Sequence, residues 1–181
     1  MNSILQRRRA LIEKKNNRLP AEFQLCEWIQ IQNGATNNYL ITDIPGGPIT
    51  KAEFVLTKHS QRSGMVISTN KSSPFGALNN SQSAYVCSPS VAVGEMVLED
   101  TLFTFTKSAG SQTGNVTLFS WNTVSWVASM RIKQAKLYAG DALVFDGVPA
   151  YRRLDDMPGL WDKVSSKFNE ATSNYSKGAD V

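Results

Sequence analysis

The amino-acid sequence predicts an all-β sandwich, and three observations support this prediction. Charged residues make up only 19% of the chain, whereas serine, threonine, asparagine and glycine are plentiful, as is typical of β-rich proteins with many turns. Apolar and polar residues alternate in segments such as 101–107 (TLFTFTK), and this period of two is typical of a strand with one buried face. Turn sequences such as PGGP at 45–48 separate the short apolar runs at intervals of about 8–12 residues.

The predicted strands follow one another along most of the chain. In order they are Gln24–Ile31, Tyr39–Ile44, Lys51–Lys58, Gly64–Thr69, Phe75–Leu78, Ala84–Ser88, Met96–Leu98, Thr101–Lys107, Val116–Ser120, Met130–Tyr138 and Leu143–Phe145. Strict alternation in the tenth of these predicts that Met130 and Ile132 share a face with Gln134, opposite Ala135 and Leu137. With 181 residues, the chain has room for one such domain and an appendage.

The appendage is a basic N-terminal arm, residues 1–18, which precedes a domain formed by residues 19–181. The arm holds six basic residues and one acidic residue, whereas the rest of the chain carries 13 basic and 14 acidic groups. Its apolar residues recur at helical spacing, so we expect a short amphipathic helix that ends before Pro20. The residues expected to contact a partner are Ile4, Leu5, Arg7, Arg8, Arg9, Leu11 and Ile12.

A short helix is marginal alone in water, so the apolar stripe of the arm needs something to pack on. A partner protein or further copies of the chain are the favoured contacts, and packing against its own domain is the alternative. Nucleic acid is a less favoured partner, because no aromatic residues are interleaved with the arginines of the arm.

Two isolated cysteines, Cys26 and Cys87, each lie within an apolar run and are expected to be buried free thiols. A single disulfide between them is the alternative. The arginines near the start are not followed by the apolar segment of a secretory signal, and no run approaches the roughly 20 apolar residues of a membrane span. We therefore expect a soluble protein that is made in a cytoplasm and not exported through its own N-terminus.

The segment from Gly140 to Phe168 begins as a hairpin around Asp141 and continues through an arginine pair, Arg152 and Arg153. We expect the arginines to form ion pairs with nearby acids, namely Asp155, Asp156 or Asp162. The sequence GLWD is expected to place Leu160 and Trp161 against the sandwich.

The two ends of the domain together resemble a known family. The family opens with basic residues, then a Leu-Pro-x-Glu-Tyr/Phe element, a strand and a turn. The opening of this chain resembles that pattern in RRRALI and LPAEFQLCEWIQIQNGATNNYLITDI. Towards the other end, FDGVP at 145–149, Arg152-Arg153, GLWD at 159–162 and Phe168-Asn169 match the family's ending in order. These segments resemble the concanavalin A-like (laminin-G-like) jelly roll carried by structural and fibre proteins of phages of gut-type bacteria. The resemblance covers mainly residues 6–44 and 117–178.

The resemblance implies a structural component of a bacteriophage virion, such as a capsid decoration, head-fibre or tail-fibre protein. It implies a location in the virion after synthesis in the cytoplasm of the bacterial host. Its partners would be other virion proteins, bound through the arm, and further copies of the chain, for example in a trimer. The alternative is a host-receptor or glycan-binding adhesion module of a phage or bacterium.

The sequence predicts no enzymatic activity and no cofactor. A glycosidase needs two carboxylates across the sugar, but Glu95 and Glu99 lie far apart on one strand face and Asp100 points elsewhere. His59 is the only histidine, so a histidine-rich metal site is excluded. We expect His59 to be an ordinary surface residue. Calcium is the one metal kept as an alternative, with loop aspartates as ligands. These are Asp141, Asp146, Asp155 and Asp156.

A tryptophan-containing segment, SWNTVSW at 120–126, is the candidate glycan site. Trp121 and Trp126 could provide an aromatic platform, and the amide of Asn122 could bind hydroxyl groups beside it. The alternative is a packed hairpin in which Trp126 belongs to the core.

Overall fold

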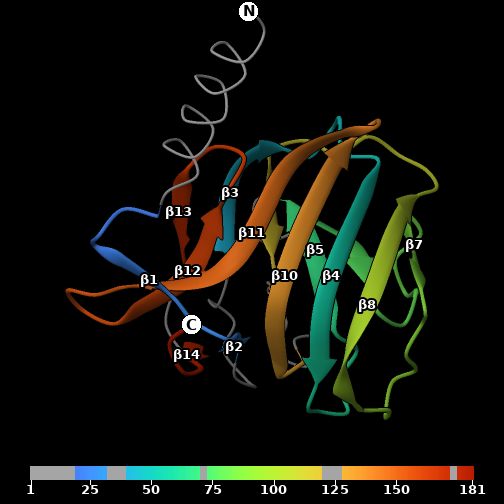
Figure 1. The fold of residues 1–181 in the computed structure, drawn as a ribbon. Coiled ribbons are helices and arrows are strands. Elements are labelled where there is room, and N and C mark those ends of the chain that lie inside the picture. The colour runs from blue at the N-terminus through green and yellow to red at the C-terminus, as the bar shows by residue number, and fades with distance from the viewer. Residues whose placement is uncertain (1–18, 32–39, 70–72, 120–127, 172–174) are drawn as a thin grey trace, which may run out of the picture.

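The computed structural model describes residues 19–31, 40–69, 73–119, 128–171 and 175–181 (Figure 1). These residues form fourteen β-strands and no helix, and the strands make two antiparallel sheets. The all-β prediction is therefore confirmed. The predicted N-terminal helix falls within residues 1–18, which lie outside the described residues.

The larger sheet forms the front layer in Figure 1. In spatial order its main strands are β13 (Lys167–Glu170), β12 (Met157–Asp162), β11 (Ala142–Arg152), β10 (Met130–Ala139), β4 (Lys51–Lys58), β8 (Val97–Lys107) and β7 (Tyr85–Ser88). The smaller sheet lies behind it. Its order is β3 (Leu40–Pro45), β9 (Asn115–Leu118), β5 (Met65–Thr69) and β6 (Ser73–Ala77).

The core lies between the two sheets and is centred on three phenylalanines. The ring of Phe54 on β4 packs edge-on against Phe105 on β8 and Phe119, which follows β9, with both centroid distances 5.6 Å. All three side chains are fully buried. Because Phe119 comes from the smaller sheet, this cluster joins the two layers, and edge-to-face pairs add to the burial energy.

Most predicted strands are present, but several have different bounds. The predicted strand 24–31 is divided into β1 (Phe23–Leu25) and β2 (Ile29–Ile31). The two predicted strands 96–98 and 101–107 are the single strand β8. The predicted 143–145 strand extends through Gly147 and Pro149 as the longer strand β11.

The two ends of the domain are held together in a gap between β10 and β11. These strands pair with each other only between Ala135–Ala139 and Ala142–Gly147, and beyond that they diverge. In the gap β2 pairs with the start of β10, and β1 pairs with the end of β11. The last strand, β14 (Tyr175–Lys177), pairs with β2, and Asp180 bridges to Cys26. The segments at both ends of the domain therefore lie side by side.

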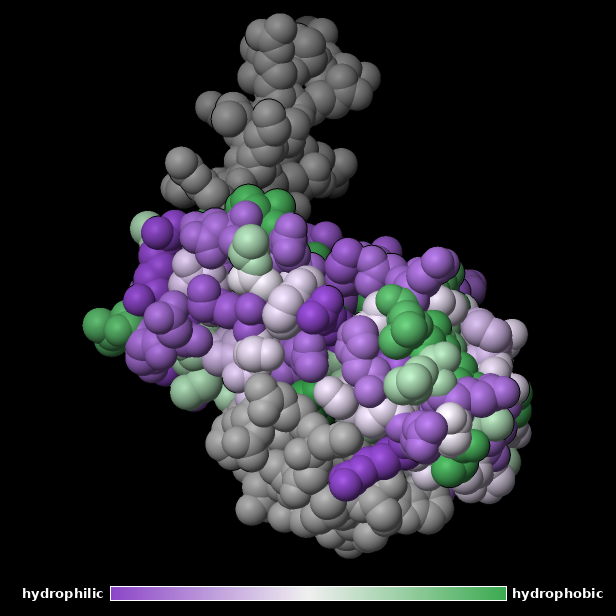
Figure 2. Space-filling view, turned by 90° about the horizontal axis from the view of Figure 1, so that it is seen from below, coloured by the Kyte–Doolittle hydropathy of each residue, from purple (hydrophilic) through white to green (hydrophobic). Residues whose placement is uncertain are grey.

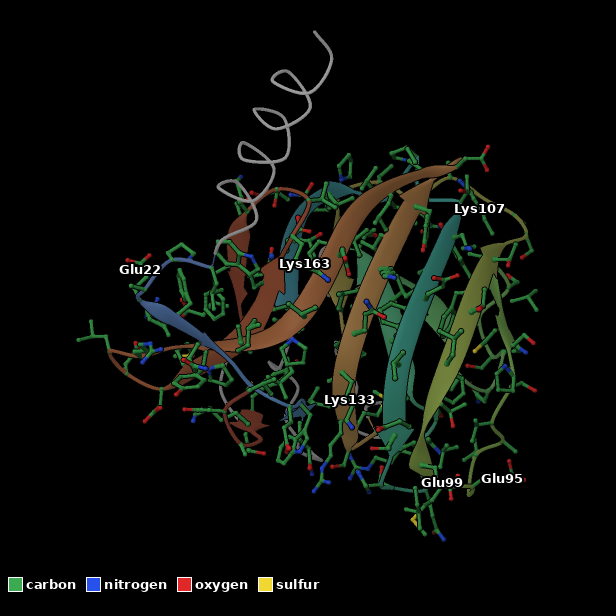
Figure 3. The ribbon with its side chains drawn as sticks, in the orientation of Figure 1. Glu22, Glu95, Glu99, Lys107, Lys133 and Lys163 are labelled. Atoms are coloured by element: carbon green, nitrogen blue, oxygen red, sulfur yellow. The ribbon has the colours of Figure 1, made fainter. Side chains whose placement is uncertain are left out.

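Exposed apolar side chains gather on β7, on β8 and in the turn between them. They are Val86, Val93, Met96, Leu98 and Leu102. Figure 2 views the molecule from the end where β8 begins, and it shows hydrophobic residues next to strongly hydrophilic ones. In Figure 3, Glu99 lies at the end of the larger sheet where β8 begins, and Lys133 and Lys163 lie on the larger sheet where they pair with Asp100 and Asp146.

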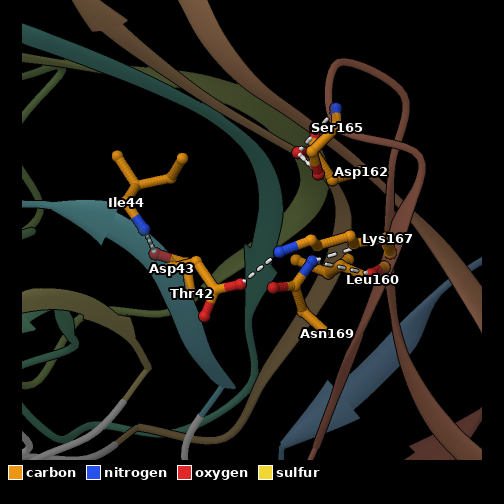
Figure 4. A network of polar contacts seen from close by, with 8 residues as sticks. All are labelled: Thr42, Asp43, Ile44, Leu160, Asp162, Ser165, Lys167 and Asn169. Carbon is orange, nitrogen blue, oxygen red and sulfur yellow. Dashed lines mark hydrogen bonds and ion pairs between the residues drawn. The ribbon is translucent and has the colours of Figure 1, made fainter.

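The edges of the two sheets approach each other where β3 meets β13. Leu40 forms an isolated bridge with Ala171, and the Nζ of Lys167 lies 2.7 Å from a carboxylate oxygen of Asp43 (Figure 4). The ion pair is exposed, so it contributes little to stability. The bridge between backbones is the stronger sign that the sandwich is nearly closed on this side.

The arginine pair after β11 is partly as predicted. Arg152 forms ion pairs with Asp155 at 2.6 Å and with Glu170 at 3.1 Å, so one predicted partner is confirmed. Arg153 instead donates to the side chain of Gln24 and to the backbone of β1. The second arginine therefore attaches the start of the domain to the 153–156 turn.

The GLWD segment forms β12, and Leu160 and Trp161 are buried as expected. Gly159 is required because a Cβ there would lie 2.3 Å from the carbonyl oxygen of Asn169. Asp162 is not an ion-pair partner of the arginines. Its carboxylate accepts hydrogen bonds from the N–H groups of Asp146, Val164 and Ser165 and from the Ser165 hydroxyl, so it holds the turn after β12.

Both cysteines are free and buried, as expected from their apolar surroundings. Burial raises the pKa of the Cys26 thiol to about 11 and that of Cys87 to about 12. Because the thiolate is the reactive form, both thiols are poor nucleophiles at neutral pH.

We expect Phe54→Ala to lower the free energy of unfolding by about 3–5 kcal/mol, because it removes the ring that joins the two sheets. The neighbouring Val55→Ala is the control. Val55 lies on the outer face of β4, and its truncation should cost about 1 kcal/mol or less. Urea denaturation measures both values, and similar losses in the two variants would contradict this description of the core.

We also expect Asp162→Ala to destabilise the fold by about 1–3 kcal/mol, because three N–H groups of the turn would lose the buried carboxylate that accepts from them. The control is Asp43→Ala, since the side chain of Asp43 is 74% exposed and its exposed ion pair with Lys167 contributes little to stability. Thermal unfolding of the two variants measures the difference. An equal stability of both variants would show that the Asp162 turn is dispensable.

Candidate functional site

The predicted site residues lie outside the part of the chain that the structure describes. In the arm they are Ile4, Leu5, Arg7, Arg8, Arg9, Leu11 and Ile12, and in the glycan segment they are Trp121, Asn122 and Trp126. These assignments stay predictions. Within the described residues, a different place has the properties of a binding site.

This place is a groove of about 630 Å³ at the end of the larger sheet where β4 finishes. The residues that line it are Glu27, Trp28, Thr57, Leu98, Glu99, Asp100, Arg131 and Lys133. They come from β4, β8, β10 and the connection between β1 and β2. Figure 3 shows Glu99 at the start of β8 and Lys133 on the lower part of β10.

A β-bulge in β10 forms one side of the groove. Ile132 pairs with Leu56, and Gln134 pairs with Val55, so Lys133 is an extra residue without a counterpart on β4. Ile132 and Ala135 are both buried, while Lys133 is exposed between them. The predicted strict alternation is therefore wrong, because the bulge moves Ala135 and Leu137 to the face that already holds Met130 and Ile132.

A larger bulge in β8 forms the opposite side. Leu56 pairs with Thr101 and Lys58 pairs with Val97, so the single residue Thr57 faces the three residues 98–100. These three residues are all exposed. Bulges often redirect side chains beside functional sites, and here both neighbours of β4 are bulged at the same level.

An ion pair connects the two bulges across β4. The Nζ of Lys133 lies 2.6 Å from the Oδ2 of Asp100, and the two side chains are 41% and 38% exposed. Such an exposed pair contributes little to stability. Its consequence is geometric, because it places one cation and one carboxylate side by side in the groove.

Trp28 and Arg131 form the third side and are held by further contacts. The guanidinium carbon of Arg131 lies 4.3 Å from the centroid of the Trp28 ring, and its Nε donates to Gln30 at 2.9 Å. Gly178 packs so closely against the indole that a Cβ there would lie 2.8 Å from Nε1. The Gly178 N–H also donates to the Trp28 carbonyl at 2.8 Å. The C-terminal segment therefore supports the tryptophan.

His59 lies next to the groove. Its Nε2 is 2.8 Å from the hydroxyl of Thr57, a groove residue. Burial lowers the pKa of His59, and the positive charge of Arg131 lowers it further. His59 is the only histidine of the chain, so its ring signals can report on the state of Arg131.

Of the three carboxylates that the sequence offered for catalysis, two lie in the groove and one does not. Glu99 and Asp100 line the groove, whereas Glu95 precedes β8 and accepts the N–H of Ala92 at 3.0 Å. In the described ranges, no three histidine, cysteine, aspartate or glutamate side chains are grouped so that they could hold a metal ion.

The predicted calcium ligands do not converge on one point. Asp146 pairs with Lys163 at 3.0 Å, and Asp155 pairs with Arg152. Asp156 faces Lys177 at 3.6 Å, and Asp141 lies in the turn between β10 and β11. Three of the four carboxylates thus face a lysine or arginine side chain, which occupies the position that a metal ion would need.

Comparison with known proteins does not place the chain in a family: no family model, curated protein or solved structure matches it. No helix in the described part of the chain is long and apolar enough to cross a membrane. The function is therefore argued from the residues and geometry of the chain itself.

We expect Arg131→Gln to raise the pKa of His59, because it removes a positive charge that disfavours the imidazolium. The value should stay below the usual 6.5, because the ring remains buried. A ¹H NMR titration of the single histidine measures this change. The control is Lys136→Gln on the same strand, and an unchanged pKa in Arg131→Gln would show that Arg131 does not act on His59.

Proposed function

We propose that this chain is a structural component of a bacteriophage virion that displays a β-sandwich and is anchored by its N-terminal arm. The observation that carries the proposal is the pairing of the two ends of the domain. β2 pairs with β14, and Asp180 bridges to Cys26, so the described strands at the two ends of the domain are paired with each other. The basic residues concentrated before Pro20 are the part of the chain that we assign to contacts with another protein.

The two antiparallel sheets are consistent with the concanavalin A-like jelly roll that the sequence resembles. The jelly-roll type itself is part of the proposal. In a capsid decoration, head-fibre or tail-fibre protein, such a sandwich is displayed on the particle surface while the arm binds other virion proteins. Self-association through the arm, for example as a trimer, follows from its apolar stripe.

The second candidate function is adhesion to a glycan on the host surface. The groove favours it, because charged and aromatic side chains converge there and are fixed by contacts with further residues. Pre-formed concave sites with a few well-placed polar groups are typical of ligand binding. This function is compatible with a role in the virion, since a displayed domain is well placed to meet the host.

We expect deletion of residues 1–18 to convert an oligomer into a folded monomer. The reason is that the stripe of Ile4, Leu5, Leu11 and Ile12 provides the apolar contact of the arm. Size-exclusion chromatography with light scattering measures the mass, and circular dichroism checks the fold.

Two variants of the full chain separate the parts of the arm. Replacing the four apolar residues by serine should abolish the oligomer, whereas replacing Arg7, Arg8 and Arg9 by glutamine should leave the apolar contact in place. A full-length chain that is monomeric, or a truncated chain that keeps the oligomer, would contradict self-association through the arm.

A further inference from the structure

We propose that the groove between the two bulges binds a neutral saccharide through adjacent hydroxyl groups. This inference deepens the glycan-binding candidate and does not depend on the virion role. It assigns the sugar to the Trp28–Arg131 groove, which is separate in sequence from the tryptophans of the predicted 120–126 segment.

The groove presents hydrogen-bonding atoms that the described residues do not use. Asp100 uses one carboxylate oxygen for Lys133, and Arg131 uses Nε for Gln30. Within the described residues, no partner is recorded for the second oxygen of Asp100, the terminal nitrogens of Arg131, or the carboxylates of Glu27 and Glu99. Among the described residues, Asp100 and Arg131 therefore keep hydrogen-bonding atoms that could bind a ligand.

The mixture of charges disfavours an anion and suits a neutral ligand that is rich in hydroxyl groups. Three carboxylates and two cationic groups line the groove, and one of each is joined in the Lys133–Asp100 pair. Two carboxylates and one guanidinium remain, so the groove carries a net negative charge and repels an anion, while a cation could not use Arg131. A hydroxyl group both donates and accepts, so two adjacent hydroxyls can donate to a carboxylate and accept from a guanidinium.

The shape and rigidity of the groove agree with this choice. Its volume of about 630 Å³ lies within the range of about 300–1,000 Å³ that is usual for ligand sites. Leu98 is 66% exposed and offers an apolar surface for the C–H face of a sugar ring. Because Gln30 holds Arg131 and Gly178 packs against Trp28, these two side chains require little further ordering on binding.

The test is a titration of the full chain with neutral oligosaccharides, namely maltohexaose, cellohexaose, xylohexaose and mannohexaose, by isothermal titration calorimetry. We expect saturable binding of at least one of them. The NMR signals of His59 should shift in the same titration, because the ligand contacts Arg131, whose charge acts on His59. Sialyllactose and a heparin oligosaccharide are the anionic comparisons.

Variants locate the binding. Arg131→Gln and Glu99→Gln should each weaken binding by about tenfold or more, because each removes a charged partner of the hydroxyls. Glu99 is exposed and contributes little to the fold, so Glu99→Gln remains informative even if Arg131→Gln disturbs Trp28. Lys136→Gln, which changes a charge elsewhere on β10, should leave the affinity unchanged.

Three results would overturn the assignment. The first is that none of the four neutral oligosaccharides binds, and the second is that only the anionic ones bind. The third is that a neutral sugar binds and its affinity falls in Trp121→Ala or Trp126→Ala but not in Glu99→Gln. That third result would keep the glycan-binding function and move the site to the 120–126 segment. Deletion of residues 1–18 tests the virion anchor separately and should not affect sugar binding.

Discussion

The regular alternation of β4 is the constraint on which the rest of the larger sheet depends. Ala52, Phe54 and Leu56 must face the smaller sheet, so both neighbouring strands have to keep their apolar residues in step with them. β10 does so by placing Lys133 outside the ladder, and β8 does so by placing three residues opposite Thr57. The extra residues can only go to the solvent side. The groove is therefore a consequence of how the core keeps its register.

Alternation in the sequence was sufficient to predict most of β4 and the second half of β8, because inward and outward residues alternate over 51–56 and over 103–106. It failed within β10. There the apolar pattern changes face between Ile132 and Ala135, and a spacing of three between inward residues was the available sign of a bulge. The break between β1 and β2 carried no comparable local signal, since it depends on the gap that β10 and β11 leave when they diverge.

The candidate site was less predictable than the fold, because its residues come from four separate segments. Trp28 and Arg131 are about a hundred positions apart, and their stacking follows from the pairing of β2 with the start of β10. The sequence directed attention to tryptophans close to each other in the chain, at 121 and 126. An isolated tryptophan beside a glutamate gave no sign of a binding surface until its distant neighbours were known.

Closure of the domain and formation of the groove are physically linked. Trp28 lies in the segment that fills the gap between β10 and β11, and its position depends on Gly178 in the C-terminal segment. Peripheral strands generally open at lower free energy than a packed core, so loss of the β2–β14 pairing would disturb Trp28 before it disturbed Phe54. Because Trp28 in turn stacks on Arg131, the groove requires both ends of the domain to be in place. The groove therefore takes its form only when the two described ends of the domain are paired.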